Sequence, residues 1–228
     1  MSETKSRSST RAKLRKIISK AWVNCIEHDY PQKIINGERA LQACFYHRLK
    51  LAFGELDKYP KRTIFVEPKL SFSNGTRCFP DLVVCDAKKV IAVIELKFLP
   101  RGVLIPREEK KLNGGLVKDI STLTKVASVL SAKKDEMGSV DMTIVNERYL
   151  GIKNKAETYQ ISTDGLLVWA GIYSKSDDVS VLEIPFIFKK NEYFGGRNWL
   201  EIHSLTEDGA HPTTHQSSSK TMKNVCAE

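Results

Sequence analysis

The chain has 228 residues, of which 41 % are hydrophobic and 28 % are charged, which suits one α/β domain with appendages. It contains no apolar run long enough to form a transmembrane helix, and its polar, Ser-rich N-terminus lacks a secretory signal. The five cysteines are scattered and include no C-x-x-C pair, which is typical of reduced thiols. We therefore expect a cytoplasmic protein without a membrane partner.

The formal net charge is +9, and such a field attracts polyanions. Many basic proteins only carry solvated lysines, so the charge favours a nucleic-acid partner without establishing one. Two pairs of zinc-ligand types exist, Cys44 with His47 and His211 with His215, but neither completes a four-ligand site.

The spacing of apolar residues predicts a first helix over residues 10–28, after a flexible arm at residues 1–9. Its basic residues fall mainly away from the apolar stripe. The simpler interpretation is an amphipathic helix docked on the domain with a solvated basic face, and the alternative is a basic face that contacts phosphates.

A second helix is predicted to begin after Asn36 and to run to about Phe53. Glu38 in its first turn projects from the same side as the core residues Leu41 and Phe45. An acidic residue in a first turn also complements the helix dipole, which is the purely structural explanation for Glu38.

Strand-like and helical segments follow in the order predicted for an α/β domain. They are strands over 63–70, 79–85 and 90–99, a helix over 116–132, a short strand over 142–145, a buried strand over 166–173, and later strands over 180–188 and 199–203. These segments and the two helices make a single domain over residues 10–205. Residues 206–228 are predicted to be a flexible tail, because they are polar and have few large apolar residues.

The informative pattern lies in two of these strands. The strand over 90–99 is apolar on both faces except at Glu95 and Lys97, which is costly unless the two side chains are paired, bound to a cation or exposed in a cleft. A turn centred on Lys88, without a bulge, would place Asp81 directly opposite Glu95. Two carboxylates that close favour a hard divalent cation between them. An ordinary Glu–Lys pair on a sheet face, with Asp81 as a turn residue, is the competing interpretation.

The sequence Pro80-Asp81 followed by Glu95-Leu96-Lys97 resembles the motif of the PD-(D/E)XK nuclease superfamily, whose core runs helix, three-strand meander, helix, strand. That order matches residues from about 37 to 173, with 133–164 as an unexplained insertion. The resemblance implies a restriction-endonuclease-like fold: a mixed central β-sheet flanked by helices, in the order α-β-β-β-α-β with extra C-terminal strands.

The resemblance also implies the chemistry. Asp81 and Glu95 would bind Mg²⁺ or Mn²⁺, helped by Glu38 and the Leu96 carbonyl, and Lys97 would position the attacking water. Lys118 would line the cleft, although a solvated lysine is the simpler interpretation of it.

The function that follows is hydrolysis of phosphodiester bonds, in DNA rather than RNA, by an endonuclease that acts as a homodimer in many members of the superfamily. The alternatives are a nucleic-acid-binding or regulatory protein that keeps the fold without significant catalysis, and a structural or interaction protein whose basic face binds a membrane or acidic partners.

Overall fold

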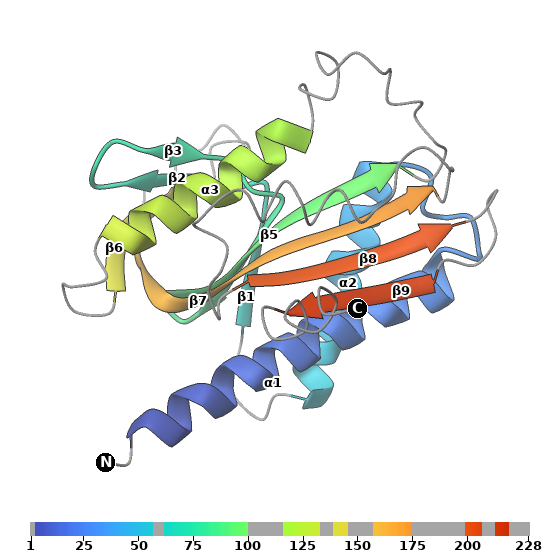
Figure 1. The fold of residues 1–228 in the computed structure, drawn as a ribbon, viewed down its shortest axis with the longest axis horizontal. Helices are drawn as coiled ribbons and strands as arrows, with labels where there is room; N and C mark the ends of the chain where they lie inside the picture. Colours follow the sequence, from blue (N-terminus) through green and yellow to red (C-terminus); the bar gives the residue numbers. More distant parts are fainter. Residues whose placement is uncertain are drawn as a thin grey trace, which may run out of the picture.

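The computed structural model describes residues 3–56, 62–99, 116–132, 139–145, 157–174, 199–206 and 213–218. The helices and strands in chain order are α1 (Glu3–Asn24), the π-helical turn η1 (Cys25–Asp29), α2 (Glu38–Leu56), β1 (Arg62–Val66), β2 (Lys69–Phe72), β3 (Arg77–Cys78), β4 (Leu82–Asp86), β5 (Lys89–Leu99), α3 (Leu116–Ala132), β6 (Ser139–Val145), β7 (Glu157–Ser174), β8 (Trp199–Thr206) and β9 (Thr213–Ser218). They form a mixed central sheet flanked by helices (Figure 1), so the α/β class predicted from the sequence is confirmed. None of the described helices has an apolar stretch of the length that a membrane crossing requires.

The sheet is built around β5 and β7, which run parallel to each other and are joined through α3. On one side of this pair, β4 is antiparallel to β5 and β1 is antiparallel to β4. On the other side, β8 is parallel to β7 and β9 is antiparallel to β8. The first half of β7 pairs with β6, which leads to β2 and β3. Within the described residues, the observed order from α2 to β7 has nine elements, and it follows the predicted α-β-β-β-α-β order only when β2, β3 and β6 are left out.

The sheet separates the core into two apolar clusters, one on each of its faces. α3 packs on one face, called here the α3 face, while α1 and α2 pack on the opposite face (Figure 1). Strand β5 contributes to both clusters, with Val93 on the α3 face and Ile94 and Leu96 on the other. This double burial explains why the strand is apolar on both sides. Because side chains alternate along a strand, Glu95 and Lys97 lie on the α3 face with Val93.

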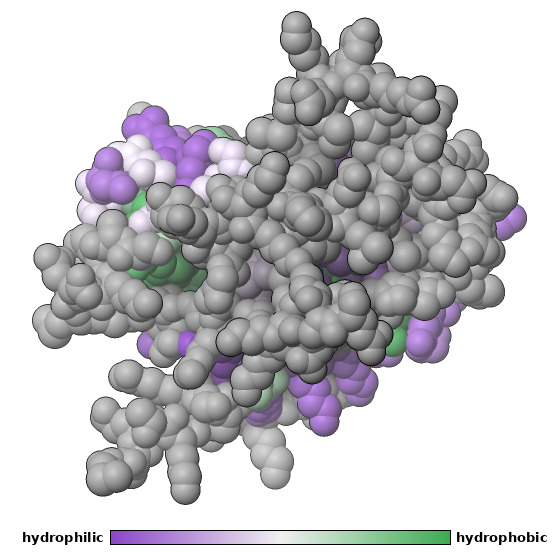
Figure 2. All heavy atoms as spheres, in the orientation of Figure 1, coloured by the Kyte–Doolittle hydropathy of each residue, from purple (hydrophilic) through white to green (hydrophobic). Residues whose placement is uncertain are grey.

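Helix α1 confirms the docked amphipathic helix. Its buried stripe is Leu14, Ile17, Ile18, Ala21 and Trp22. Figure 2 shows mostly hydrophilic colour, with a few hydrophobic atoms, along the lower edge of the molecule, where α1 lies in Figure 1. The helix begins at Glu3, so residues 3–9 are helical where the sequence predicted a flexible arm. These residues include neither Pro nor Gly, and nothing in them stops the helix from extending.

The strands differ from the prediction at several places. Strand β7 begins at Glu157, nine residues before the predicted start, and β3 was not predicted. The strand expected over 63–70 is divided, because Glu67 has a φ of 45° and separates β1 from β2. The strand expected from Phe79 begins only at Leu82. The predicted tail contains β9, which pairs with β8 along the edge of the sheet. The strand expected over 180–188 lies outside the described residues.

The four described cysteines are free thiols, as predicted. Burial raises the pKa of the Cys78 and Cys85 thiols to about 12, and burial also raises the pKa of the Cys25 thiol above its ordinary range. These thiols therefore behave as small core side chains and not as nucleophiles.

Trp22 connects α1 to both α2 and the sheet, and its removal tests that docking. Its buried ring lies 5.3 Å from the ring of Phe45, and its Nε1 donates a hydrogen bond to Ser204 Oγ at 2.8 Å. We expect Trp22→Ala to lower the free energy of unfolding by about 3–5 kcal/mol, measured by urea denaturation followed by circular dichroism. Leu51→Ala is the control, because Leu51 is 44 % exposed. Equal stability of the two variants would contradict this packing.

Candidate functional site

The pairing of β4 with β5 determines where the motif residues lie. Near the turn, Asp86 pairs with Lys89, and beyond a register shift Leu82 pairs with Ile94. Continuing that register by one residue places Asp81 opposite Glu95. The sequence predicted this placement, but it assumed a hairpin without a bulge, and that assumption is wrong. The extra residue on β5 also explains why Val90 and Val93 both lie in the cluster under α3.

Asp81 is held against β5 by its side chain and against two other segments by its backbone. Its Oδ2 accepts a hydrogen bond from Leu96 N at 2.6 Å. Its carbonyl oxygen accepts from Glu67 N at 2.8 Å and from Gln42 Nε2 of α2 at 3.2 Å. The carboxylate is therefore in a defined position beside the peptide that joins Glu95 to Leu96.

Glu95 is an acid inside the protein, since only 3 % of its surface is exposed. Its charge reaches Cys78, whose pKa is raised first by burial and then by the nearby Glu95 carboxylate. A buried carboxylate requires compensation by donors, cations or a metal ion. Glu95 and Asp81 thus bring two acids to neighbouring positions on adjacent strands.

Lys97 lies two residues after Glu95 and is tied to the start of α2. Its Nζ is 3.3 Å from Glu38 Oε2, and only 12 % of the Lys97 side chain is exposed, against 45 % of the Glu38 side chain. The structure therefore brings together Asp81 with Leu96 and Lys97 with Glu38. Lys118 lies on α3 as predicted, but its side chain is outside the described residues.

The donor set fits a hard divalent cation. Mg²⁺ needs only one or two carboxylates, with carbonyl oxygens and waters as the remaining ligands. In an extended strand the N–H and the C=O of one residue point to the same side, so the Leu96 carbonyl faces β4 as its N–H does. Within the described part of the chain, no three His, Cys, Asp or Glu side chains are grouped so as to hold a metal ion. A cation here would accordingly depend on two carboxylates, a backbone carbonyl and water.

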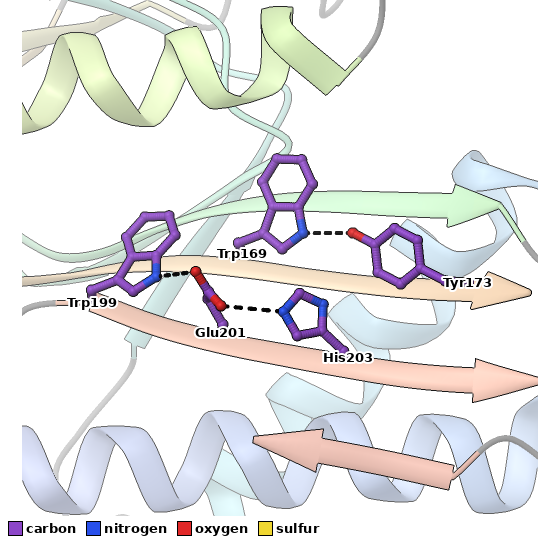
Figure 3. Close-up of polar contacts among 5 residues, drawn as sticks. All are labelled: Trp169, Tyr173, Trp199, Glu201 and His203. Atoms are coloured by element: carbon purple, nitrogen blue, oxygen red, sulfur yellow. Dashed lines mark hydrogen bonds and ion pairs between the residues drawn. The ribbon is translucent and has the colours of Figure 1, made fainter. Parts of the chain in front are cut away.

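A second group of polar side chains continues from Glu95 across the α3 face (Figure 3). The sheet register places Trp169 next to Glu95, and Glu201 next to Trp169. Glu201 is fully buried, and its Oε1 accepts from Trp199 Nε1 at 2.7 Å. Its Oε2 lies 3.3 Å from Nε2 of His203, which is 5 % exposed.

Gly171 lies between Lys97 and His203 in the sheet register, on the middle one of three adjacent strands. The Tyr173 ring folds back over Gly171, where a Cβ atom would lie 2.5 Å from the tyrosine oxygen, so a larger residue at this position would require the ring to move. The Tyr173 hydroxyl oxygen accepts from Trp169 Nε1 at 2.6 Å.

This group was not predicted, although the sequence contains an alternating pattern that indicates it. Trp199, Glu201 and His203 alternate with the apolar Leu200 and Ile202 in a segment that was predicted to be a strand. That alternation puts the polar residues on one face of the sheet, as observed. Among the described residues His203 Nδ1 has no hydrogen-bond partner, so the group retains one buried polar atom without compensation.

Comparison of the chain with protein-family models, with curated proteins and with solved structures gave no match. The interpretation of the site therefore depends on its own residues and geometry.

Glu201 is the centre of the missed group, and its replacement tests whether the group stabilises the sheet. Glu201→Ala leaves Trp199 Nε1 buried without an acceptor, and we expect it to lower the free energy of unfolding by about 3 kcal/mol. Glu201→Gln keeps an acceptor and is expected to lose less. The exposed Glu27 supplies the control, because Glu27→Ala should change stability by no more than about 0.5 kcal/mol in the same urea titration.

Proposed function

We propose that the protein is a metal-dependent nuclease of the PD-(D/E)XK type that hydrolyses phosphodiester bonds, with DNA as the expected substrate. The observation that carries this proposal is the hydrogen bond from Leu96 N to Asp81 Oδ2 at 2.6 Å. It joins the aspartate of the Pro-Asp element to the Glu-Leu-Lys element, two parts of the motif that are separated in the sequence. The order of α2, β1, β4, β5, α3 and β7, with β2, β3 and β6 left out, is that of the superfamily core and supports the proposal.

The residues take distinct roles in this proposal. Asp81 and Glu95 bind Mg²⁺ or Mn²⁺ with the Leu96 carbonyl, and Lys97 positions the attacking water or the phosphate. A divalent ion bound there supplies acidity to a coordinated water and offsets charge on the leaving oxygen. Glu38 keeps the Lys97 ammonium at the same end of the sheet, through the contact of 3.3 Å. The net charge of +9 supports a polyanionic substrate.

Two observations favour a second candidate, a nucleic-acid-binding protein with this fold and without significant catalysis. The Lys97 ammonium, which would position the attacking water, is paired with Glu38. The described residues also contain no group of three metal-ligand side chains. This candidate predicts binding of nucleic acid that does not depend on Asp81 or Glu95.

Cleavage assays decide between the two candidates. We expect plasmid and single-stranded DNA to be cut only when Mg²⁺ or Mn²⁺ is present. Asp81→Ala and Lys97→Ala should each reduce the cleavage rate by at least about 100-fold, because each removes a group that acts on the developing charge of the reaction. An RNA of the same sequence is assayed in parallel, since the proposal expects DNA to be the better substrate.

Matched controls are available on the same two strands. Asp86→Ala removes an acid of β4, and Lys89→Ala removes a lysine of β5, and both side chains are exposed at the hairpin turn. Both controls should cut at the wild-type rate, and circular dichroism should show all variants folded. If wild type cuts no faster than Asp81→Ala, the catalytic proposal is wrong. Binding that persists in every variant would then support the second candidate.

A further inference from the structure

An exposed aromatic ring lies directly before the Pro-Asp element. Phe79 is 58 % exposed, whereas the residue before it, Cys78, is 3 % exposed and the residue after it, Pro80, is buried. The chain is therefore anchored on both sides of Phe79, and proline further restricts the backbone. This arrangement presents the ring to solvent from a fixed position two residues from Asp81.

Single exposed apolar side chains are common on proteins, so the location and type of this one must carry the argument. Among the described residues, the exposed large apolar side chains are Ile34, Leu51 and Phe79, of which Phe79 is the most exposed. Phe79 is also the one with an aromatic face, which an aliphatic side chain cannot replace in stacking. In addition, the exposed Arg77 precedes it on the other side of Cys78.

An exposed aromatic ring two residues after an exposed arginine suits an unpaired strand of nucleic acid. Every base has a π-face that stacks on an aromatic ring, and a nearby cation attracts the strand's phosphates. In a duplex the base faces are already stacked on one another, so the ring has nothing to bind. Two residues span at most about 7 Å, so the ring reaches only a nucleotide next to the phosphate held at Asp81.

We propose that Phe79 stacks on an unpaired base adjacent to the phosphate that is cut, with Arg77 contacting the strand's backbone. The inference rests on the proposed nuclease function and specifies its substrate class. The substrate is a single strand, or a duplex with a locally unpaired base at the cut site, in preference to continuous duplex.

The test measures binding separately from cleavage. A single-stranded DNA oligonucleotide containing 2-aminopurine, and the duplex of the same sequence, are titrated with protein in EDTA, where no metal-dependent cleavage occurs. Phe79→Ala should weaken single-strand binding by roughly 5- to 100-fold, the range expected for the loss of one stacked base. Phe79→Trp should keep the binding, and wild type and Phe79→Trp should both quench the 2-aminopurine fluorescence. Duplex binding should change less than about twofold.

Two further variants separate stacking from general effects. Leu51→Ala removes an exposed apolar side chain 13 residues beyond Glu38 on α2 and should leave binding unchanged. Arg77→Ala should weaken binding of all sequences to a similar extent and should lower the slope of log affinity against log salt concentration by about one. Cleavage of single-stranded and duplex DNA in Mg²⁺ by the same variants should follow the binding results.

The outcomes distinguish this inference from the proposed function. If wild type cuts DNA in Mg²⁺ and Phe79→Ala binds and cuts single strands equally well, the inference is overturned and the nuclease proposal stands. Equal losses on single strands and duplex would also overturn it, because they indicate a general defect. If wild type cuts nothing but Phe79→Ala still loses single-strand binding selectively, the nuclease proposal fails and the stacking role of Phe79 stands. If wild type binds no nucleic acid, both are overturned.

Discussion

The position of the chemically important side chains depends on one extra residue in β5. A tight turn that pairs Asp86 with Lys89 would, without a bulge, pair Asp81 with Ile94. Glu95 and Lys97 would then point to the opposite face of the sheet, toward α1 and α2, since a slip of one residue exchanges the two faces. The bulge restores the alignment of Asp81 with Glu95, and the hydrogen bond from Leu96 N to Asp81 Oδ2 is its direct consequence. The bulge therefore determines the face of the sheet to which Glu95 and Lys97 point, as bulges near functional sites commonly do.

The two faces of the sheet differ in the kinds of side chain that they bury. The face under α1 and α2 is packed with apolar side chains such as Ile94, Leu96 and Ile202. The α3 face carries the buried charged or titratable residues Glu95, Glu201 and His203 among its apolar residues. Burying such groups costs free energy that an apolar replacement would not. The apolar face opposite offsets this cost. The side of the sheet covered by α1 and α2 also holds a buried acid, Asp29, and there Arg48 pairs with it.

Helices and strands were predicted correctly where a local pattern of residues determined the structure. The bounds of α3 and β5 were predicted to within one residue, because helical spacing and a continuous apolar run are strong local signals. The bulge at Ile91 was missed, since no glycine or proline marks it. The pairing of β9 with β8 was missed because it adds a polar strand at a sheet edge, where no core burial is visible in the pattern. The Trp199–Glu201–His203 alternation was visible, but its relation to Glu95 depends on the pairing of β7 with β5 and β8, which sequence spacing does not reveal.

The residues that hold Asp81 and Lys97 in place are distinct from the exposed residues that would bind the substrate strand. α2 contributes Gln42 to the backbone of Asp81 and Glu38 to the side chain of Lys97, so one helix fixes both ends of the motif. The Leu96 amide fixes the Asp81 carboxylate itself. None of these contacts involves Phe79 or Arg77, whose exposed side chains extend from the segment just before Asp81. The groups that would act on the phosphate are thus set by packing inside the domain, whereas the groups that would meet the neighbouring nucleotide lie at the surface. If the protein binds nucleic acid as proposed, substitutions at the surface positions would alter which strand it binds without displacing the acids.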